Sequence, residues 1–205
     1  MPFLGKSPPP AALTASDITD GIVSNAKLAQ DIISADTALG ATPADTDEFL
    51  VSDAGTLKRM DYSYIKASNT PAFKAISATF QAIDSATHTQ VVFGTELIDT
   101  DSAFASNTFT VPTGEGGKYF LFAQVGQQGW ATNRLLPIIR TGGDTDISCG
   151  ESTTSGAYYH ITSTSTIAEL SAADTVDVTV YQDSGSSQNL SQGFRVMFLG
   201  YKLIE

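Results

Sequence analysis

The chain of 205 residues has little of what several classes of protein depend on. It has one cysteine, Cys149, so it cannot build a framework of intrachain disulfides. Only 11 lysines and arginines stand against 22 aspartates and glutamates. The resulting net charge of -11 repels phosphate backbones and anionic lipid surfaces, so we expect no nucleic-acid partner.

Long apolar runs are also missing. No stretch of about 18 apolar residues is present to cross a bilayer, so we expect no membrane insertion. The first ten residues place three prolines where the apolar region of a secretory signal would begin. These features predict synthesis in a cytosol and, for a protein that works outside a cell, release by a route other than secretion.

From about residue 71 onward, apolar and polar residues alternate in a way that predicts an all-β fold. Val176, Val178 and Val180 alternate with polar residues over 175–181, which indicates a strand with one dry face. A second clear strand is predicted over 118–125, and others over 75–83, 90–97, 108–111, 135–140, 157–168 and 194–204. Turns rich in Gly, Pro, Asn and Asp separate them, which favours a β-sandwich or jelly roll.

The last predicted strand is apolar on both faces. One face carries Val196, Phe198 and Ile204, and the other carries Met197, Leu199, Tyr201 and Leu203. Because a strand of a two-layer sandwich meets the core with one face, something else must cover the second face. Another copy of the same chain is the favoured cover, and a loop of the same subunit is the alternative.

Residues 1–70 differ in kind from the rest. An extended arm ends in Pro8, Pro9 and Pro10, and a short helix is predicted over 24–33. A hairpin is predicted over 48–60, followed by a helical turn over 62–66. Because this segment has no core of its own, we expect it to lean on sister chains or on a larger particle. Phe3 and Leu4, ahead of the prolines, are the residues expected to insert into a partner.

Three stretches of the second part carry a resemblance to a known fold: 91–125, 170–182 and 198–204. They contain an F-T-x-P turn that leads to a glycine and an aromatic strand, and a closing aromatic-x-Gly-aromatic pattern; the residues are Phe109, Thr110, Pro112, Gly117, Tyr119, Phe122, Phe198, Gly200 and Tyr201. In this order they resemble the trimeric jelly roll of tumour necrosis factor and the complement q-subunit head. The resemblance implies a homotrimeric jelly-roll head at 71–205 with Met197, Leu199, Tyr201 and Leu203 at its interface.

The first part resembles a different group. The segments DGIVSNAKLAQDIIS and 45–66 are similar to connector segments of bacteriophage tail fibres and other virion appendages. The resemblance implies that 1–70 is an arm and connector held by other virion proteins, with Phe3, Leu4, Pro8, Pro9 and Pro10 as anchors. The expected location is the virion, after synthesis in the host cytoplasm. A tail fibre is favoured, and a capsid decoration or head fibre protein is the alternative.

A host-recognising head would need residues that contact a surface glycan or protein. Gln127, Gln128 and Trp130 lie in a predicted loop, and Tyr158 begins another strand. Aromatic rings beside amides can stack on sugars, so these four residues are the candidate receptor contacts. Burial of Trp130 in the core or in a subunit interface is the alternative.

Motifs for catalysis are absent, so we expect no catalytic residues, no metal ligands and no cofactor. The sequence has no G-x-S-x-G elbow, and Tyr119 stands where a phosphate loop needs Ser or Thr. Asp-Thr-Asp triplets at 45–47, 99–101 and 144–146 lack the rest of a calcium loop. A structural Ca²⁺, a Cys149–His160 nucleophile pair, a glycan-cleaving appendage with converging acids, and a cellular adhesion module are the alternatives.

Overall fold

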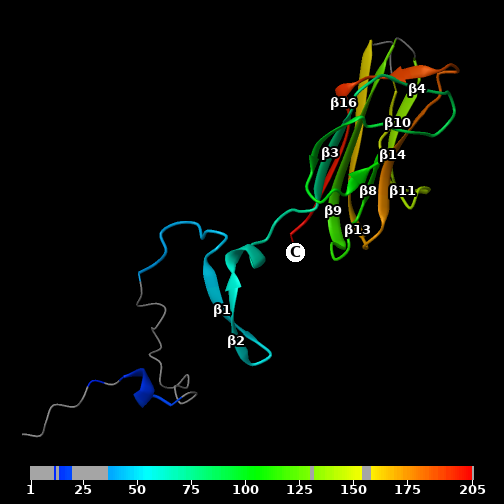
Figure 1. Cartoon of the computed structure of the whole chain (residues 1–205). Coiled ribbons are helices and arrows are strands. Elements are labelled where there is room, and N and C mark those ends of the chain that lie inside the picture. The colour runs from blue at the N-terminus through cyan, green and yellow to red at the C-terminus, as the bar shows by residue number, and fades with distance from the viewer. Residues whose placement is uncertain (1–11, 13, 20–36, 130–131, 154–157, 205) are drawn as a thin grey trace, which may run out of the picture. The chain divides into compact units, whose positions relative to one another are not determined.

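The computed structural model describes residues 12, 14–19, 37–129, 132–153 and 158–204 (Figure 1). The chain divides into two compact units, 1–66 and 67–205. The first unit contains the short helical turn η1 (Ala15–Asp17), the strands β1 (Glu48–Asp53) and β2 (Thr56–Asp61), and the turn η3 (Tyr62–Tyr64). The predicted helix over 24–33 and the anchors Phe3, Leu4, Pro8, Pro9 and Pro10 lie outside the described residues.

The predicted hairpin is confirmed. β1 and β2 pair antiparallel from Glu48–Asp61 to Asp53–Thr56. The two-residue turn uses Ala54 and Gly55 with φ angles of 49° and 86°, as a type I′ turn requires at both central positions. The helical turn that follows ends at Tyr64, two residues earlier than predicted. Asp61 takes the N-cap position without a side-chain hydrogen bond to the turn.

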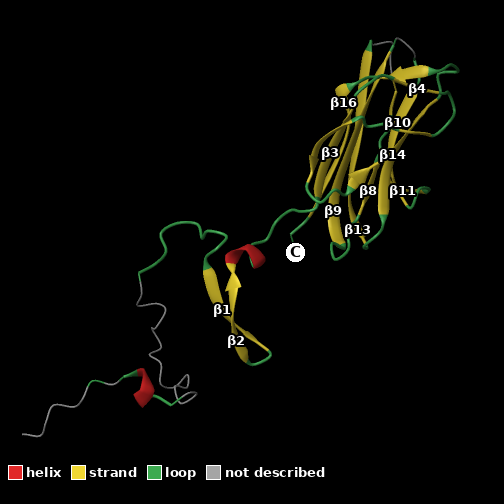
Figure 2. Cartoon of the chain, in the orientation of Figure 1, coloured by secondary structure: helices red, strands yellow, loops and turns green. Residues whose placement is uncertain are grey.

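The second unit, the head, is a sandwich of two seven-stranded antiparallel sheets (Figure 2). The first sheet runs β11 (Thr145–Cys149), β10 (Arg134–Thr141), β14 (Thr175–Gln182), β8 (Thr108–Thr110) and β7 (Phe104–Ala105), with β12 (Ser152–Thr153) on β10 and β5 (Thr89–Gln90) on β14. The second runs β4 (Gln81–Ile83), β15 (Gln188–Leu190), β9 (Gly117–Gln128), β16 (Gly193–Lys202), β3 (Ala72–Ser77) and β6 (Thr95–Asp99), with β13 (Tyr159–Leu170) on β9. The all-β prediction is therefore confirmed.

The core lies between the two sheets. The three predicted inward valines of β14 are fully buried. An aromatic cluster fills one part of the core, where the ring of Phe73 stacks on Phe109 at 4.5 Å and meets Phe198 edge-on at 4.8 Å. Burial raises the pKa of Tyr119 to about 12, and its hydroxyl donates to the Glu115 carbonyl at 2.5 Å. The buried phenol thus has the partner that its polar group needs.

The strand boundaries differ from the prediction in several places. The single strand expected over 75–83 is two strands, because the Ser77 hydroxyl donates to the Thr79 carbonyl at 2.7 Å and the chain bends there. The strand expected over 90–97 is likewise divided between β5 and β6. Ile204 follows the end of β16 and is exposed, so it does not share the buried face of Val196 and Phe198. Within the described ranges no helix has the length and apolarity to cross a bilayer.

Candidate self-association surface

β16 presents a second apolar face, away from the core. Val196 and Phe198 are fully buried, whereas Met197 and Leu199, which alternate with them, are half-buried. β9 alternates in the same way, with Leu121 buried and the neighbouring phenylalanines half-buried. Since successive side chains of a strand point to opposite faces, the outer side chains of both strands lie on one surface of the sheet.

The strand register places these side chains in rows across the sheet. Leu199 lies between Lys74 of β3 and Phe122 of β9. Tyr201 pairs with Phe120, and their rings are 5.5 Å apart. Neighbouring strands extend the rows. We define the apolar face as Ile76, Ile98, Phe120, Phe122, Ile167, Met197, Leu199 and Tyr201, with Leu203 directly beyond the end of β16.

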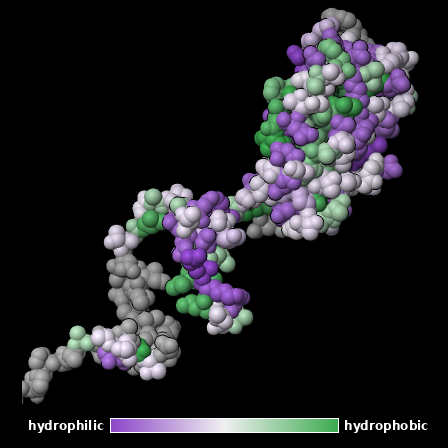
Figure 3. All heavy atoms as spheres, in the orientation of Figure 1, coloured by the Kyte–Doolittle hydropathy of each residue, from purple (hydrophilic) through white to green (hydrophobic). Residues whose placement is uncertain are grey.

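The apolar face is visible as a gathering of hydrophobic residues along the side of the head where β3 and β16 lie (Figure 3). Few charges interrupt it. Lys74 lies within one row, and its ammonium is 5.4 Å from the ring centre of Phe194. Lys118 and Glu169 stand opposite each other at its edge, two residues from Phe120 and Ile167. A large apolar surface with few charges is the composition of the core of an interface between proteins.

The structure places the predicted interface residues Met197, Leu199 and Tyr201 together on this surface, and Leu203 follows the end of their strand. It adds Ile98 and Ile167, which the sequence analysis missed. Ile167 is 61% exposed and pairs with Phe120. Its strand alternates serine with threonine, so neither face stands out by hydropathy, and only the pairing with β9 reveals the outer one.

Gln127 corrects the prediction of receptor contacts. It is 1% exposed, because the inward alternation of β9 continues past Val125 to include it. Its amide exchanges two hydrogen bonds of 3.0 Å with the amide of Asn133, which satisfies both buried groups. Gln127 is therefore part of the interior and is not available to a receptor.

Two other predicted contacts, Gln128 and Tyr158, lie next to each other in the head. Gln128 is half-buried, and its amide donates to the Tyr158 hydroxyl. Tyr158 and Tyr159 are exposed, with ring centres 4.6 Å apart in an edge-on arrangement. The Arg195 guanidinium lies 4.3 Å from the ring centre of Tyr159, a contact that the sequence did not indicate. Trp130 lies outside the described residues.

Each of the three Asp-Thr-Asp triplets has a carboxylate that is held by a contact within the fold. Asp99 accepts hydrogen bonds from the backbone amides of Ala103 and Phe104 at 2.8 and 3.3 Å. Asp45 pairs with Lys66, and Asp146 pairs with Arg140. Among the described residues there is no group of three or more His, Cys, Asp or Glu that could hold a metal ion.

The surroundings of Cys149 oppose nucleophilic chemistry. Desolvation raises the pKa of its thiol, and the nearby carboxylates of Asp146 and Glu151 raise it further. A reactive cysteine needs the opposite shift, which an adjacent cation or helix N-terminus provides. Cys149 pairs with Ile138 in the first sheet, whereas His160 pairs with Gln127 in the second.

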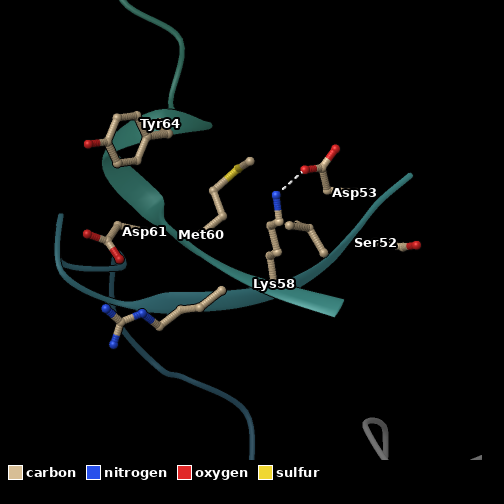
Figure 4. Close-up of a pocket in the computed structure, with 8 residues that line it drawn as sticks. Ser52, Asp53, Lys58, Met60, Asp61 and Tyr64 are labelled. Atoms are coloured by element: carbon tan, nitrogen blue, oxygen red, sulfur yellow. Dashed lines mark hydrogen bonds and ion pairs between the residues drawn. The ribbon is translucent and has the colours of Figure 1, made fainter. Parts of the chain in front are cut away.

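A hollow of about 520 Å³ lies on the hairpin of the first unit (Figure 4). Its lining combines the Lys58–Asp53 ion pair with the apolar side chains of Val51 and Met60 and with Tyr64. Two strands and one turn bound it, without a second layer to close it. It is thus a surface of the hairpin open to another element and not an enclosed ligand site.

No protein-family model matches the sequence, and no curated protein is similar enough to count as a relative. Among solved structures, murine APRIL at pH 5.0 is 15% identical, and the match covers 64% of this chain and 98% of APRIL with a TM-score of 0.51. The globular domain of zebrafish complement 1qA is 16% identical over 66% of this chain and 99% of its own, with a TM-score of 0.48. The likeness to APRIL shows the fold of the head, which is the jelly roll predicted from the sequence.

Proposed function

We propose that this chain is a structural protein that assembles as a homotrimer through the apolar face. The observation that carries the proposal is that face, where Leu199, Phe122 and Tyr201 lie on the side of the sheet turned away from the core. In a two-layer sandwich these side chains leave water only when another molecule covers them. The resemblance to trimeric jelly rolls supports three as the number of subunits.

A non-catalytic role is the second part of the proposal. The surroundings of Cys149 disfavour a thiolate, and Asp99 and Asp146 have contacts within the fold that hold their carboxylates. The conspicuous feature of the head is an apolar surface, which serves association. A building block, and not an enzyme, is the role that these features support.

We propose further that the trimer is a bacteriophage virion appendage fastened through residues 1–70 to other virion proteins, with the head projecting. The similarity of 45–66 to connector segments and the order of arm, connector and jelly-roll head support this placement. Capsid decoration is the alternative. Electron microscopy of virions labelled with an antibody to the head separates the two by the position of the label.

Host contact belongs to the end of the head that carries Tyr158 and Tyr159. Both rings are exposed, and Gln128 of β9 contacts Tyr158 while Arg195 of β16 contacts Tyr159. Exposed aromatic rings with amides beside them suit the apolar face and hydroxyls of a sugar. We expect Tyr158→Ala to reduce adsorption of virions to host cells with the trimer intact, and unchanged adsorption would remove this role.

A charge placed in the apolar face tests the trimer. In Leu199→Asp, three carboxylates would be buried at the interface, each directly across from Lys74 of its own chain. Burying such a pair of charges costs more than burying apolar side chains, so we expect the mass of a single chain by sedimentation. Thr110→Asp is the matched control, because Thr110 is exposed on the opposite sheet, and it should leave the trimer intact. Circular dichroism would verify that both variants are folded. A folded Leu199→Asp protein that keeps the mass of a trimer would refute the proposed interface.

A further inference from the structure

The hairpin of the first unit has no core. Every residue over 37–66 is exposed or half-buried. Leu50 is 76% exposed and Leu57 is 69% exposed, and the ring of Tyr64 is exposed as well. An isolated two-stranded hairpin is marginally stable in water at best, so this one needs a partner to persist.

The register separates the two faces of the hairpin. Leu50 pairs with Arg59 and Leu57 pairs with Ser52, so the two leucines are diagonal neighbours on one face. Phe49 pairs with Met60 on the other face, and the ring of Tyr62 lies 6.2 Å from the ring of Phe49. The chain's own turn thus contributes cover to the Phe49 face, and the leucines of the other face are more exposed than Phe49, Val51 and Met60. Figure 3 shows hydrophobic and hydrophilic residues side by side on the hairpin.

The charges of the hairpin permit contact between identical copies. Arg59 pairs with Glu48 at 2.8 Å on the leucine face, and Lys58 pairs with Asp53 on the other. Each cation therefore has its anion within the same hairpin. Asp61 also lies on the leucine face, opposite Glu48 at the end of the hairpin away from Leu57. Two copies that meet where the leucines lie bring together the neutralised pairs, and like charges do not oppose that contact.

The short linker between the hairpin and the head favours the hairpins of sister chains as the partner. Residues 67–71 join η3 and its following turn to β3 and reach at most about 18 Å. On a trimeric head, three hairpins would share a small volume at an effective concentration in the millimolar range. We propose that the Leu50–Leu57 face packs against the same face of the sister chains. This inference rests on the proposed homotrimer.

A disulfide test uses the full chain with Cys149→Ser as background, since Cys149 is exposed and forms no disulfide. Leu57→Cys places a thiol on the leucine face. Thr56→Cys is the matched control, one residue away on the opposite face. After oxidation we expect the band of the covalent dimer on a non-reducing gel to be at least tenfold more intense for Leu57→Cys than for Thr56→Cys. At completion, roughly two thirds of the chains would be dimeric, because a disulfide joins two of three subunits.

The native mass of the same samples separates the two ways in which the test can fail. A trimeric mass with equal, weak cross-linking of both variants would overturn the contact between hairpins and leave the proposed trimer standing. A single-chain mass would overturn the homotrimer, and the contact between hairpins with it.

Discussion

Gly200 lies in β16 where the strand passes close to the core. A Cβ atom at this position would lie 2.8 Å from both Leu121 Cδ2 and Phe73 Cε1, and 3.0 Å from the Phe120 carbonyl oxygen. We expect Gly200→Ala to lower the free energy of unfolding of the head by about 1–3 kcal/mol, because the tightly packed neighbours must move. Urea unfolding followed by circular dichroism measures the change.

Gly116→Ala is the control for that substitution. The nearest atom to a Cβ at Gly116 would be the Leu170 carbonyl oxygen at 3.5 Å, an ordinary contact. Its effect should stay within about 0.5 kcal/mol. Equal effects of the two substitutions would show that the close approach at Gly200 does not constrain the fold.

His160 makes the stability of the head depend on pH. Burial lowers the pKa of its imidazole, and its Nε2 atom is buried. The unfolded chain, with a histidine pKa of about 6.5, therefore binds the proton more readily than the folded one. The contribution of the neutral ring is complete above that pH and is lost as the pH falls through the lower, folded value.

We therefore expect wild-type protein to lose more unfolding free energy than His160→Gln between pH 7.5 and pH 5. Denaturant unfolding at the two pH values measures both losses. The comparison between the two proteins cancels the contribution of the carboxylates. Losses of the same size would mean that His160 is no more buried than in the unfolded chain.

Gln127 and Asn133 show which side-chain contacts could not be predicted from the sequence. The alternation of β9 predicts that Tyr119 and Val125 face inward, as they do. The same alternation continues to Gln127, whose burial depends on a hydrogen-bond partner, Asn133, that lies outside the strand. A polar residue at the end of an apolar pattern is therefore predicted to lie in a loop when its hydrogen-bond partner is not known.

The two faces of β16 have different structural roles, one in the core and one in the apolar face. Phe198 is fully buried against Phe73, whereas Met197 beside it belongs to the apolar face. Phe198→Ala should lower the free energy of unfolding by about 3–5 kcal/mol through the lost contacts and the cavity left behind. Met197→Ala should weaken the trimer while changing the unfolding of the head less.

Chemical unfolding at one fixed protein concentration, together with sedimentation over a range of concentrations, measures the two effects. The fixed concentration matters because association itself adds to apparent stability. If Met197→Ala destabilised the head as much as Phe198→Ala and left association unchanged, the assignment of the two faces would be wrong.

Long alternating strands were the predictable elements. β9 and β14 follow the period of two over most of their length and were found close to where the sequence placed them. β7, β12 and β15 have two or three residues each, too few for a period to emerge. β12 and β15 pair with the long strands β10 and β9, and β7 pairs with the short strand β8. The bend between β3 and β4 depends on the hydroxyl of Ser77, which an alternating pattern does not reveal.

For the whole molecule, the buried core and the N-terminal hairpin belong to separate units. The buried hydrophobic residues of the described chain all lie within 73–198. A chain of residues 67–205 should therefore fold and form trimers. Virions assembled with this chain in place of the full one should lack the head. Purified virions probed with an antibody to the head would show the loss. Incorporation of the truncated chain at the normal level would contradict the role of the first unit as an anchor.

The central claim concerns how many copies meet at the apolar face. Multi-angle light scattering of the intact protein at micromolar concentration measures this directly. We predict a mass three times the 21.6 kDa of one chain. A stable, folded species with the mass of a single chain would contradict the account, because the side chains around Leu199 would then be exposed to water without a partner.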